Sequence, residues 1–462
     1  MFICSGSSKG IELYRVQYEQ AVLKVSEPIR VVSNCRNFSF SPKFNFVALY
    51  TKTGVQTPDF PDKFVQIFSF DPKTGNMKHL QDIPVANIIN VIFSPQGRYF
   101  ALILRKNSVT DEHKTPLIQI YKTGSPDLIR GFTYASGRVP TLFWSEDETV
   151  FASTNLNGIR FVETMDNGEE KVTDVEFKNL LAASFTNVRG KIRYAVVYDD
   201  KTGEAKKMKI MEYPEPKHIA FRPVMVGESY TIQISPSGSS AIAIGTKNSS
   251  NDSYFGETFA YYLNVQGQTK LQLKKSGPIY AINYSLTGDK FVTIAGQIPP
   301  SVAINFDKIG TQFEIGQFPY NSIRYSCLPN LVAIGGFGNF TGDIQVFDIQ
   351  TRQTIGEGNA QYTSEWGWSP CGRLLLSAVL YPKMMVSNEF RIYNHLCQKL
   401  YTMKATELTQ CEWVGITKPM NIPKIVNTQP KTAPVAYIPP HLRAQQARSG
   451  PKNPPGFSNR KR

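Results

Sequence analysis

The sequence is poor in the residues that build metal sites and catalytic centres. Its 462 residues include five histidines and six cysteines. No Cys-x-x-Cys pair is present, and no histidine stands at motif spacing from a cysteine or a carboxylate, as a zinc site or a catalytic triad would need. We therefore expect no enzyme activity, no metal and no cofactor. The scattered cysteines indicate buried thiols in a reducing compartment.

Long apolar runs are missing as well. No stretch approaches the ~20 apolar residues of a membrane-spanning helix, and no basic N-terminal stretch leads into an apolar run with a cleavage site. Sustained helical spacing of apolar residues is also absent, while 33 glycines and 30 prolines interrupt the chain. These absences predict an all-β protein of the cytoplasm that does not enter a membrane.

What the sequence does contain is a repeated unit, in which an apolar residue is followed by Ser-Pro, a turn and a short β-rich run. Clear copies begin at Phe40, Phe93, Ile234 and Trp368, weaker copies at Phe143, Tyr284 and Tyr325, and a poor copy at Ala183. The marker serines stand at positions 41, 94, 145, 184, 235, 285, 326 and 369, so the intervals run from 39 (145 to 184) to 53 (41 to 94). A period in this range is typical of the blades of a β-propeller.

A second repeated unit is a strand that alternates apolar and polar residues and ends near an aromatic residue. Its nine copies are residues 11–16, 65–70, 118–123, 159–164, 208–213, 259–265, 302–307, 344–349 and 390–395. The first copy has no serine-marked unit before it, and residues 407–416 look like a first strand with nothing after it. Pairing the chain ends would complete this blade and hide both sheet edges. We therefore predict a nine-bladed β-propeller closed by pairing of the N- and C-terminal strands; two stacked sandwiches would not require a unit at near-constant spacing.

The positive charge is concentrated near the C-terminus. The net charge is +14, and residues 418–462 contribute nine Lys or Arg and no Asp or Glu, which leaves +5 for residues 1–417. Nine prolines in the same segment prevent a continuous helix or a central strand. We therefore divide the chain into a propeller over 1–417 and a disordered, basic, proline-rich tail over 418–462, which is suited to polyanions.

The candidate functional residues all lie in this tail. Candidate contacts to RNA or the ribosome are its basic residues Arg443, Arg448, Lys452, Arg460, Lys461 and Arg462. The segment AYIPPHLRAQQAR over 436–448 is a candidate motif for partner recognition, centred on Tyr437, Pro439 and Pro440. The alternatives are a solvated linker for the motif and a solubilising end for the basic residues.

Two further features invite a functional interpretation, and each has a structural alternative. The string GGFGNFTGD over 335–343 resembles a phosphate-binding loop, but a strand follows it where a helix would be needed, so we predict a turn between strands. Trp366 and Trp368 are expected to share one face of an inner strand. Packing between blades is favoured there over a contact residue at the channel mouth.

Four segments stand out in this order: IGGFGNFTGDIQVFD (334–348), WSPCGRLLLSAVLYP (368–382), MVSNEFRIYNH (385–395) and AYIPPHLR (436–443). In these segments the sequence resembles the eukaryotic translation initiation factor 2A family. The resemblance implies a WD-repeat-like nine-bladed propeller followed by a basic C-terminal region. It also implies a cytoplasmic factor that binds the small ribosomal subunit and messenger RNA and contacts other initiation factors. Such a factor supports delivery of initiator methionyl-tRNA without GTP in non-standard initiation.

The resemblance has limits, and other functions stay open. Family members usually continue well past the proline motif with charged helical segments, so contacts located there are not carried over. A generic propeller scaffold for protein complexes is one alternative. The propeller scaffold subunit of the large initiation factor complex is another, although its RNA-recognition domain and long helix have no counterpart here. A propeller hydrolase is a third, and the inner strands carry few residues for it. We expect a monomer.

Overall fold

The computed structural model describes residues 1–416 except 34, 53–64, 106–115, 135–138, 165–169, 201–204, 216, 225–226, 248–256, 268–270, 272–276, 308–311 and 382. The chain divides into two units, Met1–Ile422 and Pro423–Arg462. The predicted tail over 418–462 lies outside the described residues. Its disorder and its exact boundary therefore stay predictions.

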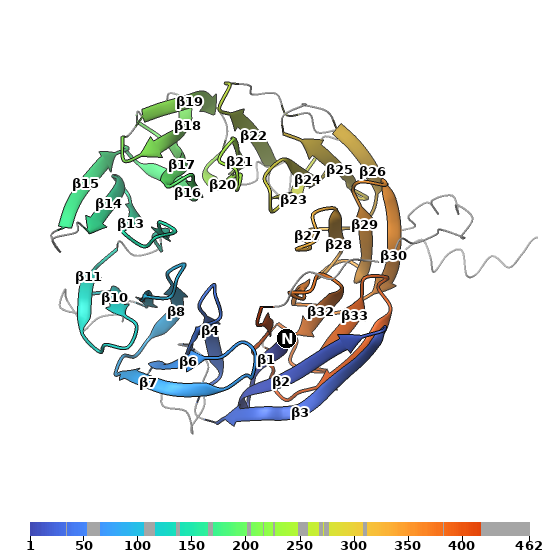
Figure 1. Ribbon diagram of the computed structural model, residues 1–462. Helices are drawn as coiled ribbons and strands as arrows, with labels where there is room; N and C mark the ends of the chain where they lie inside the picture. The colour runs from blue at the N-terminus through green and yellow to red at the C-terminus, as the bar shows by residue number, and fades with distance from the viewer. Residues whose placement is uncertain are drawn as a thin grey trace, which may run out of the picture. The chain divides into compact units, whose positions relative to one another are not determined.

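The first unit is a ring of nine antiparallel sheets, each forming one blade (Figure 1). Blade 1 contains β35 (Gln410–Val414), β1 (Phe2–Ser7), β2 (Gly10–Glu19) and β3 (Val22–Val32). Blade 2 contains β4 (Asn37–Phe40), β5 (Phe46–Tyr50), β6 (Val65–Phe70) and β7 (Met77–Ile83). Blade 3 contains β8 (Ile88–Phe93), β9 (Tyr99–Leu104), β10 (Ile118–Lys122) and β11 (Leu128–Phe132). Blade 4 contains β12 (Leu142–Trp144), β13 (Val150–Asn155), β14 (Gly158–Thr164) and β15 (Glu170–Glu176).

The remaining five blades follow in chain order. Blade 5 contains β16 (Leu180–Val188), β17 (Lys191–Tyr198), β18 (Lys206–Tyr213) and β19 (Lys217–Val224). Blade 6 has three described strands, β20 (Ser229–Ile234), β21 (Ser240–Lys247) and β22 (Glu257–Asn264). Blade 7 contains β23 (Ile279–Tyr284), β24 (Lys290–Ala295), β25 (Ser301–Phe306) and β26 (Gln312–Gln317). Blade 8 contains β27 (Ser322–Tyr325), β28 (Leu331–Gly335), β29 (Asp343–Asp348) and β30 (Gln353–Asn359). Blade 9 contains β31 (Glu365–Trp368), β32 (Leu374–Val379), β33 (Glu389–Asn394) and β34 (Lys399–Lys404).

The ring closes in blade 1, where the two ends of the propeller pair. β35 runs antiparallel to β1, with Phe2 opposite Val414 and Gly6 opposite Gln410. The Gln410 side chain also joins the next blade, because its amide accepts the Phe38 N–H at 3.2 Å and donates to the Phe38 carbonyl at 3.0 Å. The predicted nine-bladed propeller with paired termini is confirmed. The nine alternating segments form the third strand of each blade.

The marker serine recurs because it closes the turn between the first two strands of a blade. The Ser369 N–H donates to the Leu374 carbonyl at 2.8 Å, and the buried Ser369 hydroxyl accepts the Leu374 N–H at 3.1 Å. Gly372, at φ 75°, completes the turn with an N–H bond to the Ser369 carbonyl. The same amide-to-hydroxyl bond is made at Ser41, Ser94, Ser145 and Ser235. We call the face that carries these turns the serine face.

The marker assigned to blade 5 was wrong, although the blade itself is present. Ser184 lies in the middle of β16, opposite Ala195 of β17. Pairing continues to Val188 and Lys191, and the two strands are joined by Arg189 at φ 50° and Gly190 at φ 77°. A two-residue turn with positive φ at both positions needs no serine hydroxyl. The sequence match at Ser184 was therefore fortuitous.

The core lies between neighbouring blades, because each sheet buries both of its faces. Ala48, Tyr50 and Val65 of blade 2, for example, pack with Val91 and Phe100 of blade 3 in one buried cluster. Alternating side chains thus point to the blade before and the blade after. This packing makes the ring, and not the single blade, the stable unit.

The two tryptophans of blade 9 belong to this packing. Trp366 is 9% exposed, and its indole N–H donates to the Ser322 hydroxyl at 2.8 Å. The Trp368 indole N–H donates to the Arg324 carbonyl at 2.9 Å. Both acceptors are on β27 of blade 8, so the predicted role in packing between blades is confirmed. Residues 336–342 of the glycine string join two strands, β28 and β29, as predicted.

A buried carboxylate joins blades 6 and 7. Asp307, 6% exposed, follows β25 and accepts hydrogen bonds from the Ser240 hydroxyl at 2.5 Å, the Tyr262 hydroxyl at 2.7 Å and the Ser239 hydroxyl at 2.7 Å. The Tyr284 hydroxyl lies 2.9 Å from that of Ser240. The three donors come from β21, β22 and the turn before β21, so one side chain ties two blades together.

Candidate binding surfaces

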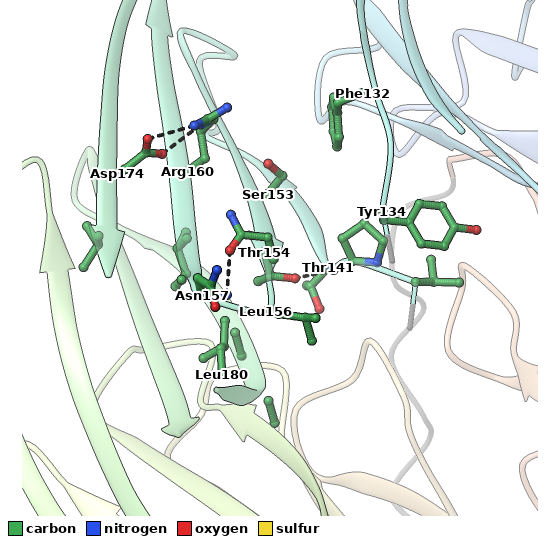
Figure 2. Close-up of a pocket in the computed structure, with 18 of the residues that line it drawn as sticks. Phe132, Tyr134, Thr141, Ser153, Thr154, Leu156, Asn157, Arg160, Asp174 and Leu180 are labelled. Atoms are coloured by element: carbon green, nitrogen blue, oxygen red, sulfur yellow. Dashed lines mark hydrogen bonds and ion pairs between the residues drawn. The ribbon is translucent and has the colours of Figure 1, made fainter. Parts of the chain in front are cut away.

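A hollow of about 910 Å³ lies on blade 4, on the face opposite the serine face (Figure 2). Antiparallel order puts the connection from β13 to β14 and the connections between blades on this face. The wall is formed by the end of β11, the turn from β13 to β14, the end of β15 and the first residues of β16 and β20. The hollow therefore combines residues from blades 3 to 6 that lie up to about a hundred positions apart in the chain (130 to 232).

The charged groups of this hollow are already paired. Arg160 donates two hydrogen bonds to Asp174, Nε to Oδ1 and Nη2 to Oδ2, each at 2.8 Å (Figure 2). These bonds lower the pKa of the Asp174 carboxyl and raise that of the Arg160 guanidinium, so both stay charged. Each side chain is about half exposed, at 54% and 50%. The pair offers a ligand hydrogen bonds and little net charge.

Apolar side chains make up much of the remaining wall. Val139 is 48% and Leu156 46% exposed, and Phe132, Tyr134 and Ile232 line the same space. The lining contains no histidine, cysteine or lysine, hence no side chain suited to act as a neutral base or a thiolate nucleophile. The apolar wall and the paired charges of this hollow suit a ligand with apolar and amide groups.

A second, smaller hollow of about 440 Å³ lies at the serine face, between blades 5 and 6. It is lined by Val188, Arg189, Lys191, Arg193, Glu212 and Ser237. Lys191 Nζ lies 2.8 Å from Glu212 Oε1, and Arg193 Nη2 lies 2.9 Å from Glu212 Oε2. Both cations lower the pKa of the Glu212 carboxyl. Three cations and one carboxylate thus line the hollow, and two of the cations contact that carboxylate.

This hollow belongs to the most basic blade of the ring. Residues 180–224 contain nine Lys or Arg and five Asp or Glu, a net charge of +4. The whole of residues 1–417 carries only +5, because acidic segments such as residues 142–176, with two Lys or Arg and nine Asp or Glu, offset the basic blades. The net charges of residues 1–417 and 418–462 do not reveal this positive blade. The net charge of each repeat would have revealed it.

None of the residues predicted to contact RNA or a partner can be placed. Those residues, Tyr437, Pro439, Pro440, Arg443, Arg448, Lys452, Arg460, Lys461 and Arg462, lie outside the described residues. They stay predictions, and both hollows are sites that the sequence did not indicate.

Titratable groups within the described part of the chain do not assemble into a metal site. All six cysteines are free thiols, and five are buried as expected, but Cys327 is exposed, contrary to the prediction. It lies in the wide turn before β28, which replaces the tight Ser-Pro turn there. Burial lowers the pKa of His395 to about 4, so this imidazole is neutral at pH 7. No helix among the described residues has the length and apolar character needed to span a bilayer.

The fold and its surfaces define a nine-bladed β-propeller with binding hollows on both faces. A family model described as "Eukaryotic translation initiation factor eIF2A" matches residues 227–411, which cover blades 6 to 9 and the start of the closing strand. Relatives that carry the same name extend over nearly the whole chain, so the match and the relatives together support the eukaryotic translation initiation factor 2A family.

Two relatives are named eukaryotic translation initiation factor 2A. That of Schizosaccharomyces pombe is 22% identical over 96% of this chain and 78% of its own length. That of Drosophila melanogaster is 28% identical over 44% of this chain and 34% of its own length, so the chain spans about a third of that relative. A solved structure titled "Crystal structure of the eukaryotic initiation factor" superposes with a TM-score of 0.73, 22% identity, and coverage of 91% of this chain and 99% of the other. At that identity it supports the propeller fold alone.

Proposed function

We propose that the protein is a translation initiation factor that binds the small ribosomal subunit. Similarity to this family carries this proposal, since the relatives that match the propeller are named translation initiation factors. The net charge of +14 supports it, because ribosomal RNA presents a dense array of phosphates. We propose that the protein works by binding and not by catalysis, since the relatives that it matches are named initiation factors.

The proposal extends to what the factor carries. It supports GTP-independent delivery of initiator methionyl-tRNA in non-standard initiation and contacts messenger RNA, acting as a cytoplasmic monomer. The basic residues from Arg443 to Arg462 neutralise RNA phosphates, while Tyr437, Pro439 and Pro440 contact a protein partner among the initiation factors.

Sedimentation tests the central claim. Full-length protein is run with small ribosomal subunits on sucrose gradients at 50 and 200 mM salt. If six tail cations each neutralise one phosphate, the slope of log affinity against log salt is about 0.7 × 6, or ~4, and binding falls about 300-fold between the two salts. A variant with the six tail Arg and Lys changed to Gln should lose most of this dependence. Migration in light fractions at both salts would contradict ribosome binding.

A separate measurement tests the tRNA claim. Filter binding of initiator methionyl-tRNA to the protein with small subunits, with and without GTP, should give equal retention in both conditions. Elongator methionyl-tRNA is the matched control and should be retained less. Retention that requires GTP, or that is equal for the two tRNAs, would overturn this part of the proposal.

A protein-scaffold function is the second candidate, and the hollow on blade 4 favours it. Its exposed Val139 and Leu156 beside a neutralised Arg160–Asp174 pair suit apolar and amide groups of a polypeptide. Leu156→Glu would block such a contact without disturbing the core. If ribosome binding is weakened in L156E but its slope against log salt is unchanged, the hollow contacts a protein of the complex. If ribosome binding is unaffected, the hollow has no part in it.

A further inference from the structure

The turn between β16 and β17 places an arginine where the backbone disfavours it. Arg189 has a φ of 50°, in the left-handed region, and Gly190 follows at 77°. Turns of this geometry favour Asn or Gly at the first position. Strained positions of this kind concentrate at functional sites, so Arg189 is a candidate functional residue. Arg189 is exposed and lines the smaller hollow between blades 5 and 6.

The cations around this hollow have two different roles. Arg193 is committed to the protein, because Nη1 donates to the Gly238 carbonyl at 3.1 Å and Nη2 to Glu212 at 2.9 Å. Its side chain is 20% exposed, so Arg193 braces the turn of blade 6 against blade 5. Lys191, by contrast, is 53% exposed and uses one of its three protons on Glu212. Arg189 and Lys191 therefore retain donors that point to solvent.

Glu212 holds Lys191 and Arg193 in place but does not neutralise the positive charge of this hollow. Its side chain is 16% exposed and is held between Lys191 and Arg193. Lys217, exposed at the start of β19, is the register partner of Glu212 on the adjacent strand. Glu215, in the turn between them, is the second carboxylate of this edge. Four cations and two carboxylates give this edge a net positive charge. Because the ion pairs already hold the side chains, binding an anion costs less conformational entropy.

We propose that this hollow binds two adjacent backbone phosphates of RNA, one contacted by Arg189 and one by Lys191, with these cations positioned by Arg193 and Glu212. The inference rests on the proposed function and names an RNA contact on the propeller itself. The cations lie along one edge and continue to Lys217, which suits successive phosphates of a strand. A single phosphorylated side chain would need convergent donors around one point.

Fluorescence anisotropy with the full chain tests the site. The probe is a labelled 20-nucleotide single-stranded RNA of mixed sequence, titrated at several salt concentrations between 50 and 200 mM. Arg189→Ala with Lys191→Ala should weaken binding about tenfold at the lower salt. It should also reduce the slope of log affinity against log salt by about 1.4, or 0.7 for each lost phosphate contact. Ser237→Asp removes no cation but puts a carboxylate in the hollow, and it should weaken binding to a similar extent.

The matched control is Lys399→Ala with Lys404→Ala on the outer strand of blade 9. Both lysines are exposed, and this variant loses the same charge as the double variant in the hollow. Equal anisotropy curves for the two double variants would overturn the site, as would unchanged binding in S237D. Circular dichroism melts of the two double variants should coincide, because none of their substituted side chains is buried. Ser237→Asp stands outside this comparison, since the Ser237 hydroxyl lies 2.7 Å from that of Ser239, which donates to Asp307. Displacement of the labelled RNA by a phosphoserine peptide at a far lower concentration than unlabelled RNA requires would assign the hollow to a protein partner and refute the RNA contact.

The failure of the site and the failure of the function give different results. If wild-type protein sediments with small subunits but the hollow variants bind RNA like the blade 9 control, the site is wrong and the function stands. If wild-type protein does not sediment with subunits, yet the hollow variants lose RNA affinity, the site stands and the ribosome claim falls.

Discussion

Asp307→Ala should be among the most damaging single substitutions outside the apolar core. The Asp307 carboxylate accepts three hydroxyl donors at 2.5 to 2.7 Å, from Ser239, Ser240 and Tyr262. Ser240 and Tyr262 are buried, so the variant leaves two buried hydroxyls without their acceptor. An orphaned buried donor costs about 1–3 kcal/mol, and bonds to a charged acceptor lie at the upper end. The free energy of unfolding should therefore fall by roughly 3–5 kcal/mol.

Urea unfolding followed by far-ultraviolet circular dichroism at pH 7 measures this loss. Asp348→Ala is the matched control, because Asp348 ends the third strand of blade 8 but accepts N–H bonds from Gln350 and Thr351 at the surface. Its loss should cost less than about 1 kcal/mol. Asp307→Asn should fall between the two, since the amide keeps one acceptor oxygen but turns a donor toward the hydroxyls. Equal midpoints for D307A and D348A would refute the view that the buried carboxylate ties blades 6 and 7 together.

Three further substitutions probe the turn, the closure and the pH dependence. Ser369→Ala removes the hydroxyl that accepts the Leu374 N–H and should lower the free energy of urea unfolding by about 1–2 kcal/mol, whereas no change would show that the turn needs no side-chain acceptor. Gln410→Ala breaks the amide pair with Phe38 and should speed proteolysis near the N-terminus by a few fold, with Gln398→Ala as control; equal rates would exclude this role in closure. Because burial holds the pKa of His395 near 4, below its usual 6.5, the unfolded chain takes up a proton between these values that the folded chain does not. Wild-type stability should therefore fall from pH 6.5 to 4 by up to about 3 kcal/mol more than that of His395→Gln, and parallel pH profiles would exclude this linkage.

The ring could be predicted because each repeat carries strand and turn signals within a short stretch of sequence. The third strands alternate apolar and polar residues, and a slip of one position would expose every core side chain, so the pattern marks the strand and its faces together. The marker serine recurs at Ser41, Ser94 and Ser369 because its hydroxyl satisfies a backbone N–H that the turn leaves without a partner. Blade 5 escaped this rule because Arg189 and Gly190 close the hairpin by backbone geometry alone.

The surfaces could not be predicted in the same way, because they depend on contacts between blades. The hollow on blade 4 is lined from Arg130 to Ile232, and no local pattern brings those residues together. The smaller hollow joins the hairpin of blade 5 to Ser237 in the turn of blade 6. Here part of a signal did exist, since Gly190 is typical of the second position of a two-residue hairpin turn, although Arg189 is not typical of the first. This signal predicts that Arg189 lies in the turn between two strands and that Lys191 begins the second strand.

The protein thus has two positive regions, and their salt signatures can be separated. The tail residues from Arg443 to Arg462 and the hollow at Arg189 and Lys191 act on different phosphates if both proposals hold. The slopes of log affinity against log salt should then add: about 4 units are lost in the six-residue tail variant, about 1.4 in the hollow variant, and about 5.6 in the combined variant. If the combined variant has the same slope as the tail variant, the hollow binds RNA only when the tail has already done so. In that case the propeller would orient an RNA that the tail captures, and the two regions would be steps of one binding event.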